Sequence, residues 1–195
     1  MAPFANLKVL DFSADFAGSY CSKLLGDFGA SVKKIIYEGR EDRSASYGPF
    51  IDQLGHPKSS AMFHYMNYNK EIISVSKVTP SIEELALSAD LLVEDFSSED
   101  FHFSGLDLEN IRILNPNLLI CSLTPFGRET KWSEKPWSDL TIQALTGMCS
   151  VNGEQDKAPL KEPGTESELI TGANAFVASV AALINRDVTG IPQDV

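Results

Sequence analysis

The sequence predicts an α/β fold built on a doubly wound parallel sheet. Short apolar runs typical of buried strands alternate five times with helical segments. The 195 residues are 43% hydrophobic, with a mean hydropathy of -0.08, as in ordinary globular proteins. No internal repeat, low-complexity segment or linker interrupts this pattern. We therefore expect a single domain spanning residues 1–195.

In the first half of the chain, we expect three strands and one well-defined helix. Residues 8–12 form a short apolar run of strand type. A helix follows over residues 19–28, with Gly29 as its stop and one apolar face made of Tyr20, Leu24, Leu25 and Phe28. The next two strands are expected at 32–37 and 71–76. Between them, the Gly-, Ser- and charge-rich segment 38–64 predicts a long loop with a short helix, and such loops are usually functional.

The second half continues the alternation and then becomes helical. Ser81 and Glu84 have the spacing of a capping box, which opens a helix running to about residue 89. Strands are expected at 91–96 and 117–123, with a helix at 108–114 that Asn115-Pro116 ends. Ser138 can cap a helix running to about Met148. The last helix, residues 172–186, is apolar on almost every face, which predicts a buried helix.

Composition argues against several functional classes. The chain has 16 Lys and Arg against 27 Asp and Glu, a net charge of -11, which does not suit a nucleic-acid partner. Cys21, Cys121 and Cys149 are far apart and have no ligand-like spacing with the histidines, so we expect neither disulfides nor a metal. We identify no signal peptide, and no apolar run approaches membrane-spanning length, so we expect no membrane partner and a cytoplasmic protein.

Familiar nucleotide motifs are absent from the sequence. The first strand-to-helix turn, residues 12–19, lacks Gly-x-Gly-x-x-Gly, and there is no Walker-type Gly-Lys-Ser/Thr. NAD or ATP binding by that route is not predicted. There is also no Gly-x-Ser-x-Gly elbow, so serine hydrolase chemistry has no anchor in this chain.

Glu168 is the most informative single residue. It lies just ahead of the last predicted helix, where the helix dipole favours an ionised carboxylate by roughly 0.3 to 1 kcal/mol. An exposed, ionised carboxylate there could act as a nucleophile. The alternative is that Glu168 is only a charge that stabilises the start of the helix.

A series of short motifs runs in order along nearly the whole chain. The motifs are Leu7–Phe12, Phe16–Gly18, Leu24–Val32, Asn67–Lys70, Ala89–Phe96, Gly105–Leu106, Asn115–Pro116, Ser122–Gly127, Gln143–Ala144, Ala181–Leu183 and Thr189–Gly190. No one of them is specific. As an ordered set, they resemble the amino-terminal half of the family III (CaiB/BaiF-type) CoA-transferases.

The resemblance implies a Rossmann-like large domain that transfers coenzyme A between an acyl-CoA and a carboxylic acid through an enzyme carboxylate. The family's nucleophile is Asp, and Glu168 stands in its place, with Glu166 as the alternative if the register slips by two. The match ends near Gly190, inside a family segment, so we expect the smaller domain to be absent. The resemblance also implies a homodimer, or a partner that carries the missing half.

The same resemblance implies residues that bind coenzyme A. Phe16, Ala17 and Gly18 could let it lie close to the first turn, or could simply form a tight turn. Lys70 is expected to contact a CoA phosphate, unless it is a solvated lysine at a strand edge. Phe96 is expected to stack on adenine, with packing in the core as the alternative.

Departures from the family pattern leave a second function open. Ile36 stands where the family has Glu, and Tyr68 replaces Arg. These changes favour a non-catalytic homologue that binds CoA or has a structural role. Asp139 matches a family Asp, for which we expect a structural role. No histidine lies just ahead of it, so a two-base racemase is not predicted.

Overall fold

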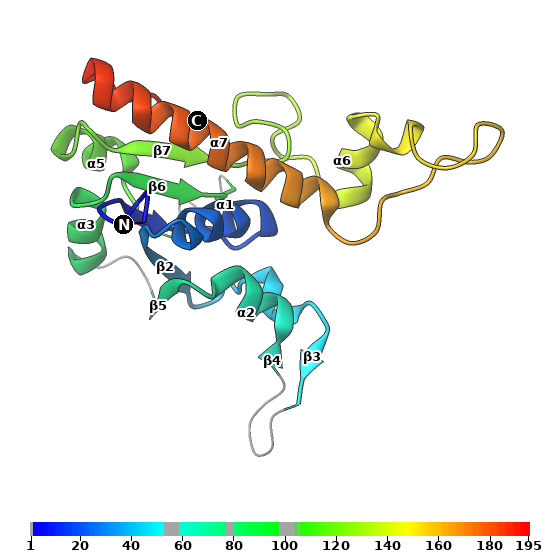
Figure 1. Cartoon of the computed structure of the whole chain (residues 1–195), viewed down its shortest axis with the longest axis horizontal. Helices are drawn as coiled ribbons and strands as arrows, with labels where there is room; N and C mark the ends of the chain where they lie inside the picture. Colours follow the sequence, from blue (N-terminus) through cyan, green and yellow to red (C-terminus); the bar gives the residue numbers. More distant parts are fainter. Residues whose placement is uncertain (1, 53–58, 77–79, 98–103, 105) are drawn as a thin grey trace.

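The computed structural model describes residues 2–52, 59–76, 80–97, 104 and 106–195 (Figure 1). Five parallel strands form one sheet in the order β5-β2-β1-β6-β7. Their bounds are β1 Lys8–Asp11, β2 Ser31–Tyr37, β5 Lys70–Val75, β6 Leu91–Glu94 and β7 Leu119–Ser122. This order reverses direction between β1 and β6, as in Rossmann-like sheets. The predicted fold class and all five strands are confirmed, with ends shifted by a residue or two.

Helices cover both faces of the sheet. On one face, α1 (Phe16–Asp27) and α7 (Glu166–Thr189) pack on an apolar cluster that includes Val9, Leu91 and Leu119. On the other face, α3 (Pro80–Leu87) and α5 (Leu108–Leu114) pack on a cluster that includes Leu10, Leu92 and Ile120. Consecutive apolar residues of β1, β6 and β7 thus serve opposite cores, which explains the continuous apolar runs of these strands, whereas the edge strand β5 is largely exposed.

Helix α1 starts at Phe16, earlier than the predicted start at residue 19. Its buried face also differs from the prediction, because Phe28 is 46% exposed and only Leu25 of the four expected residues is fully buried. The contact with α7 selects small residues instead. A Cβ on Gly172 would lie 2.4 Å from the backbone oxygen of Ala17, so the two helices approach at backbone distance.

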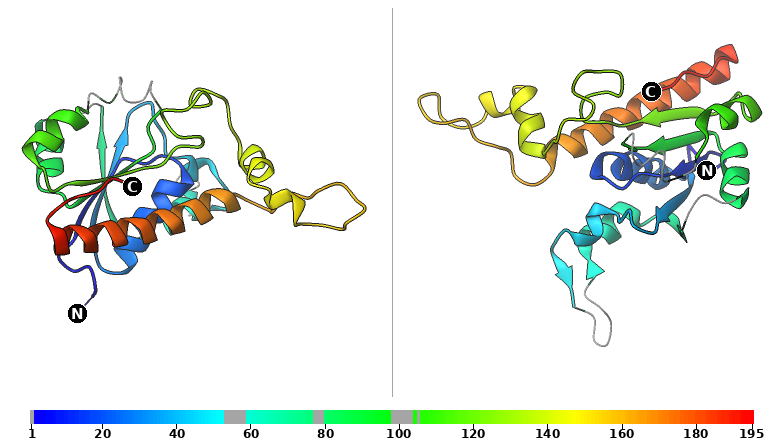
Figure 2. Two further views of the ribbon diagram at one scale, coloured as in Figure 1. Left: turned by 90° about the horizontal axis from the view of Figure 1, so that it is seen from above. Right: turned by 180° about the vertical axis from the view of Figure 1, so that it is seen from behind.

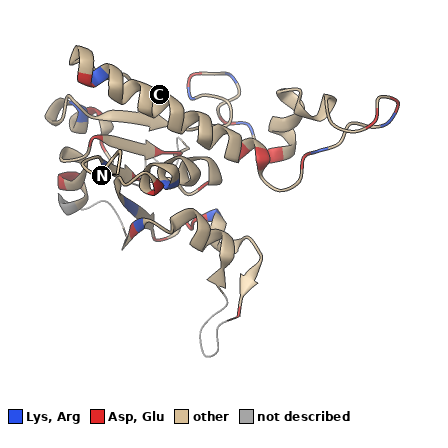
Figure 3. Ribbon diagram, in the orientation of Figure 1, with Lys and Arg blue, Asp and Glu red and all other residues tan. Residues whose placement is uncertain are grey.

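Helix α7 is 24 residues long and starts at Glu166, ahead of the predicted start at residue 172. The predicted buried helix is buried on one face only, which includes Gly172, Ala175, Ser179, Ala182 and Leu183, while Ile170, Val177, Ile184 and Val188 are exposed. No charge interrupts its middle (Figure 3). Its length and composition would allow it to cross a membrane, contrary to expectation, but core helices of soluble proteins pass the same test.

The remaining elements extend away from the sheet (Figures 1 and 2). Within the expected loop 38–64, the structure has a 3₁₀ helix η1, a short antiparallel pair and the start of a helix: η1 Arg43–Ser46, β3 Phe50–Ile51, β4 Ser59–Ser60 and α2 Ala61–Asn67. Ser138 caps α6 (Asp139–Leu145) as predicted. The expected continuation to Met148 breaks at Gly147 (φ 83°) and resumes as η2 (Met148–Ser150). The side chain of Ser81, the expected cap of α3, lies outside the described residues.

Candidate active site

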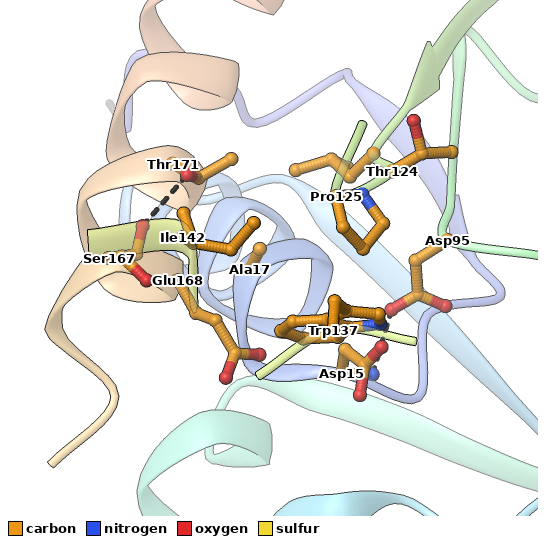
Figure 4. A pocket seen from close by; sticks show the side chains of 11 residues that line it. Asp15, Ala17, Asp95, Thr124, Pro125, Trp137, Ile142, Ser167, Glu168 and Thr171 are labelled. Carbon is orange, nitrogen blue, oxygen red and sulfur yellow. Dashed lines mark hydrogen bonds between the residues drawn. The ribbon is translucent and has the colours of Figure 1, made fainter. Parts of the chain in front are cut away.

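A groove lies at the carboxyl ends of β1, β6 and β7, where doubly wound sheets bind ligands. Figure 4 shows the inner part of this groove. Side chains converge there from the turn between β1 and α1, from the segments after β6 and β7, and from the starts of α6 and α7. Two adjoining hollows share the wall made by Asp15, Asp95, Leu123, Thr124, Pro125 and Trp137. The inner hollow adds Ala17, Ile142, Ser167, Glu168 and Thr171.

Glu168 lines the inner hollow from the first turn of α7. Its side chain is 5% exposed and meets the guanidinium of Arg43 through two contacts. The Nη1 of Arg43 lies 3.0 Å from Oε2 of Glu168, and its Nη2 lies 3.3 Å from Oε1. This two-point pair joins residues 125 positions apart in the sequence. Glu166 is exposed and lies outside the lining of the hollow.

Arg43 is held by more than Glu168. Its Nη1 also donates to Oδ1 of Asp15 at 2.7 Å. The guanidinium carbon lies 5.2 Å from the ring centre of Phe16 and 5.3 Å from that of Trp137, within cation–π range. The side chain of Arg43 is nevertheless 44% exposed. One guanidinium thus faces the groove while contacting two carboxylates and two aromatic rings.

The environment of Glu168 raises its pKa from 4.5 to about 7. Burial is the largest cause, because it disfavours the charged form. The positive charge of Arg43 acts in the opposite direction, whereas the negative charges of Asp15 and Asp139 raise the pKa further. Near neutral pH the carboxyl group of Glu168 therefore exists in both protonation states.

Asp139 positions the start of α7 from a neighbouring helix. Its Oδ1 accepts the backbone N–H of Ser167 at 3.1 Å and also the Ser167 hydroxyl. Gln143 and Lys161 hold the other oxygen at 2.7 Å and 2.6 Å. Burial alone would raise the pKa of Asp139, but the bonds from Lys161 and Ser167 hold it below its usual value. This carboxylate supplies the cap that explains the early start of α7, which is the structural role expected for it.

Asp95 holds the backbone of the turn between β1 and α1, a role that the sequence did not reveal. Directly after β6, its carboxylate accepts the backbone N–H groups of Ala14 and Asp15 and pairs with Arg40, whose Nη2 lies 2.6 Å away. Burial, opposed by Arg40, raises the pKa of Asp95 to about 6. The available signal was an acidic residue at the end of a strand, next to the point where the strand order reverses.

Lys70 is not exposed, contrary to what a phosphate contact requires. Its side chain is 0% exposed, and its ammonium lies 2.9 Å from both Oδ2 of Asp11 and the backbone oxygen of Ser19. Lys34, equally buried, pairs with Asp42 at 2.8 Å and lies 3.9 Å from Asp11. The four side chains form a buried network with two charges of each sign. Because Asp42 immediately precedes Arg43, the network anchors the start of η1.

Of the other residues expected to contact CoA, some line the groove and others are packed in the core. Ala17 lines the inner hollow. Phe16 is 1% exposed and lies in contact with Arg43. A Cβ on Gly18 would lie 2.4 Å from Cβ of Ser13, so this glycine satisfies close packing inside the turn. Phe96 is 1% exposed and packs against the rings of Phe12 and Tyr37, as in the core alternative, although it borders the outer hollow.

Metal-ligating side chains do not assemble within the part of the chain that the structure describes. No group of three or more His, Cys, Asp and Glu residues there could hold an ion. His56 and His102 lie outside the described residues. The three cysteines are free and buried.

Comparison with known proteins identifies the family. A succinate–glutarate CoA-transferase of Agrobacterium fabrum is 31% identical over 99% of this chain and 50% of its own length. A succinyl-CoA:mesaconate CoA-transferase of Haloarcula marismortui is 32% identical over 97% and 50%. The crystal structure of a CaiB/BaiF family protein from Brucella suis superposes with a TM-score of 0.87 at 33% identity, covering 99% of this chain and 52% of that one. The chain thus spans about half the length of these relatives. Residues 4–195 match CoA-transferase family III, and the chain belongs to that family.

Proposed function

We propose that this chain takes part in the transfer of coenzyme A from an acyl-CoA to a carboxylic acid, with Glu168 as the attacking carboxylate. The observation that carries the proposal is the position of Glu168. In a chain of this family, it places a carboxylate in the hollow at the reversal point of the sheet. The relatives named above are CoA-transferases, and the match covers nearly all of this chain.

Every step of the proposed chemistry passes through the carboxyl group of Glu168. An oxygen of Glu168 attacks the thioester carbonyl carbon, the C–S bond breaks, and an anhydride and the CoA thiolate form. The thiolate then attacks the glutamyl carbonyl of the anhydride, which releases the donor acid and leaves a thioester between Glu168 and CoA. The acceptor carboxylate attacks this thioester, and the sequence runs in reverse to release the new acyl-CoA and restore the Glu168 carboxylate.

The residues around Glu168 suit it to this cycle in part. A pKa of about 7 leaves a large ionised fraction at neutral pH and a carboxylate more basic than an ordinary one. Asp139 fixes the helix turn that carries Glu168. The pair with Arg43 must loosen before an oxygen of Glu168 can reach a thioester carbon.

That pair also favours the second candidate, a non-catalytic homologue that binds CoA or has a structural role. A carboxylate that is 5% exposed and held at two points by Arg43 could serve only to fasten η1 to α7. The two candidates differ in whether Glu168 ever becomes covalently modified.

We further propose that the exposed apolar residues of α7 are covered by a second copy of the chain or by a partner segment that supplies the other half of the relatives' length. These residues are Ile170, Val177, Ile184 and Val188. They recur at i, i+7, i+14 and i+18 on one side of the helix, and an exposed apolar helix side is typical of an interface. A cytoplasmic location with acyl-CoA as substrate fits the proposal.

Native mass spectrometry tests the proposal directly. The purified protein is incubated with acetyl-, succinyl- and formyl-CoA, and any covalent CoA or acyl adduct is mapped by digestion. An adduct on Glu168 that disappears in Glu168→Gln, but survives in the matched first-turn control Glu166→Gln, supports the transferase. CoA bound without an adduct in any sample supports the non-catalytic homologue. Activity that appears only in Glu168→Asp would identify a decayed transferase.

A further inference from the structure

We infer that Arg43 is the receptor for the carboxylate of the acid substrate, which takes the place that the Glu168 carboxylate occupies in the resting site. The inference rests on the proposed function. It starts from the two-point contact between the Arg43 guanidinium and Glu168, with N–O distances of 3.0 Å and 3.3 Å. Two parallel N–H groups facing two carboxylate oxygens are the arrangement by which arginine recognises carboxylates in general.

The charge on Glu168 changes during the proposed cycle, while that on Arg43 does not. In the thioester state Glu168 carries no carboxylate, so the guanidinium loses its negative partner at 3.0 Å and, among the residues that the structure describes, keeps Asp15 at 2.7 Å. The incoming acid carries one carboxylate, which restores the lost charge and both hydrogen bonds. A carboxylate seated there lies beside the glutamyl carbonyl that it has to attack.

The surroundings of Arg43 keep the receptor in place when Glu168 leaves it. Asp15 holds Nη1, and the rings of Phe16 and Trp137 lie against the guanidinium. Asp42, which caps η1 from the adjacent position, is itself fixed in the buried ion network by Lys34. Arg43 is 44% exposed toward the groove, so a ligand can reach it. The receptor therefore stays formed through the cycle and exchanges one carboxylate for another.

Equilibrium binding tests the receptor without requiring any turnover. Glu168→Ala removes the internal carboxylate and opens the space it fills. We expect this variant to bind succinate at least about tenfold more tightly than the wild-type protein, which corresponds to about 1.4 kcal/mol. Succinamide, of the same shape but uncharged, should not bind. Isothermal titration calorimetry, with circular dichroism to verify folding, gives both results.

A second substitution assigns the binding to Arg43. Adding Arg43→Gln to Glu168→Ala should abolish succinate binding, and Arg43→Lys, which keeps the charge but not the paired N–H groups, should retain only part of it. The control is Lys135→Gln in the same background, because Lys135 is an exposed cation of the same groove. Equal succinate affinity with and without Arg43, or binding of succinamide as well, would overturn the inference.

The covalent half-reaction separates this inference from the proposed function. In protein whose thioester on Glu168 is already formed, the acid concentration that gives half-maximal discharge should rise at least about tenfold in Arg43→Lys relative to the wild-type protein. An unchanged acid dependence contradicts the receptor role. If the wild-type protein forms no adduct, the transferase proposal fails, and the calorimetry still decides whether Arg43 receives a carboxylate.

Discussion

The substitution Glu168→Gln should change how the stability of the protein depends on pH. Burial raises the pKa of Glu168 from 4.5 to about 7 in the folded chain. Each unit corresponds to about 1.36 kcal/mol, so the shift is equivalent to about 3 kcal/mol of unfolding free energy. Because the side chain is 5% exposed, solvent screening reduces this value little. Gln resembles the protonated form at every pH and removes this dependence.

The direction in which the unfolding free energy changes with pH follows from proton binding. A raised carboxyl pKa means that the folded state holds a proton that the unfolded state has released, between pH 4.5 and about 7. The proton on Glu168 therefore stabilises the folded wild-type protein fully below pH 4.5, and this stabilisation is lost as the pH rises toward 7. The unfolding free energy of Glu168→Gln minus that of the wild-type protein should therefore increase by about 3 kcal/mol between pH 4.5 and pH 8.

Urea unfolding followed by circular dichroism, in steps of half a pH unit, measures this difference. Asp95, with a pKa of about 6, titrates in the same window but is present in both proteins, so its contribution cancels. The control is Glu166→Gln, an exposed carboxylate in the same helical turn, which should leave the pH profile unchanged. A difference between Glu168→Gln and wild type that stays constant across the window would refute a raised pKa at this residue.

Three further substitutions test the supports of the site by chemical or thermal unfolding. Asp139→Ala removes the cap of α7 and should cost about 0.5 to 2 kcal/mol, so an unchanged urea midpoint would contradict the capping role. Gly172→Ala places a Cβ 2.4 Å from the Ala17 oxygen and should cost about 1 to 3 kcal/mol through separation of the helices; full stability would show that they can move apart freely. Lys70→Met removes a buried charge partner of Asp11 and should cost about 3 to 5 kcal/mol, whereas a neutral effect would point to a surface lysine.

The strands could be predicted because their signal is local. Most are short apolar runs, and both faces of the central sheet are covered, so burial leaves its mark on nearly every position of β1, β6 and β7. The starts of the helices were harder to predict from the sequence. Helix α7 begins where Asp139, 28 positions away, supplies a hydrogen-bond acceptor, and the turn before α1 is held by Asp95, 81 positions from Ala14. Local sequence carries no trace of such partners.

The candidate site likewise contains residues that local sequence could predict and residues that it could not. Glu168 could be singled out from its place before an apolar helix and from the resemblance to a family. Arg43 could not, because in the charged loop it looks the same as Arg40, and its partner is 125 positions distant. Lys70 was expected near a phosphate, yet its side chain extends beneath α1 to Asp11, a direction that the alternation of a strand does not reveal.

The length of the side chain at position 168 and the presence of Arg43 have one explanation. An Asp carboxylate would lie about 1.5 Å farther back, the length of one C–C bond, and would lose the contacts that Glu168 makes at 3.0 Å and 3.3 Å. Glu reaches the guanidinium and stays paired with it, while burial raises its pKa against the opposing charge of Arg43. Under the proposed function, a carboxylic acid bound at Arg43 would displace the longer Glu168 side chain, so the pairing of the nucleophile would depend on the acid substrate.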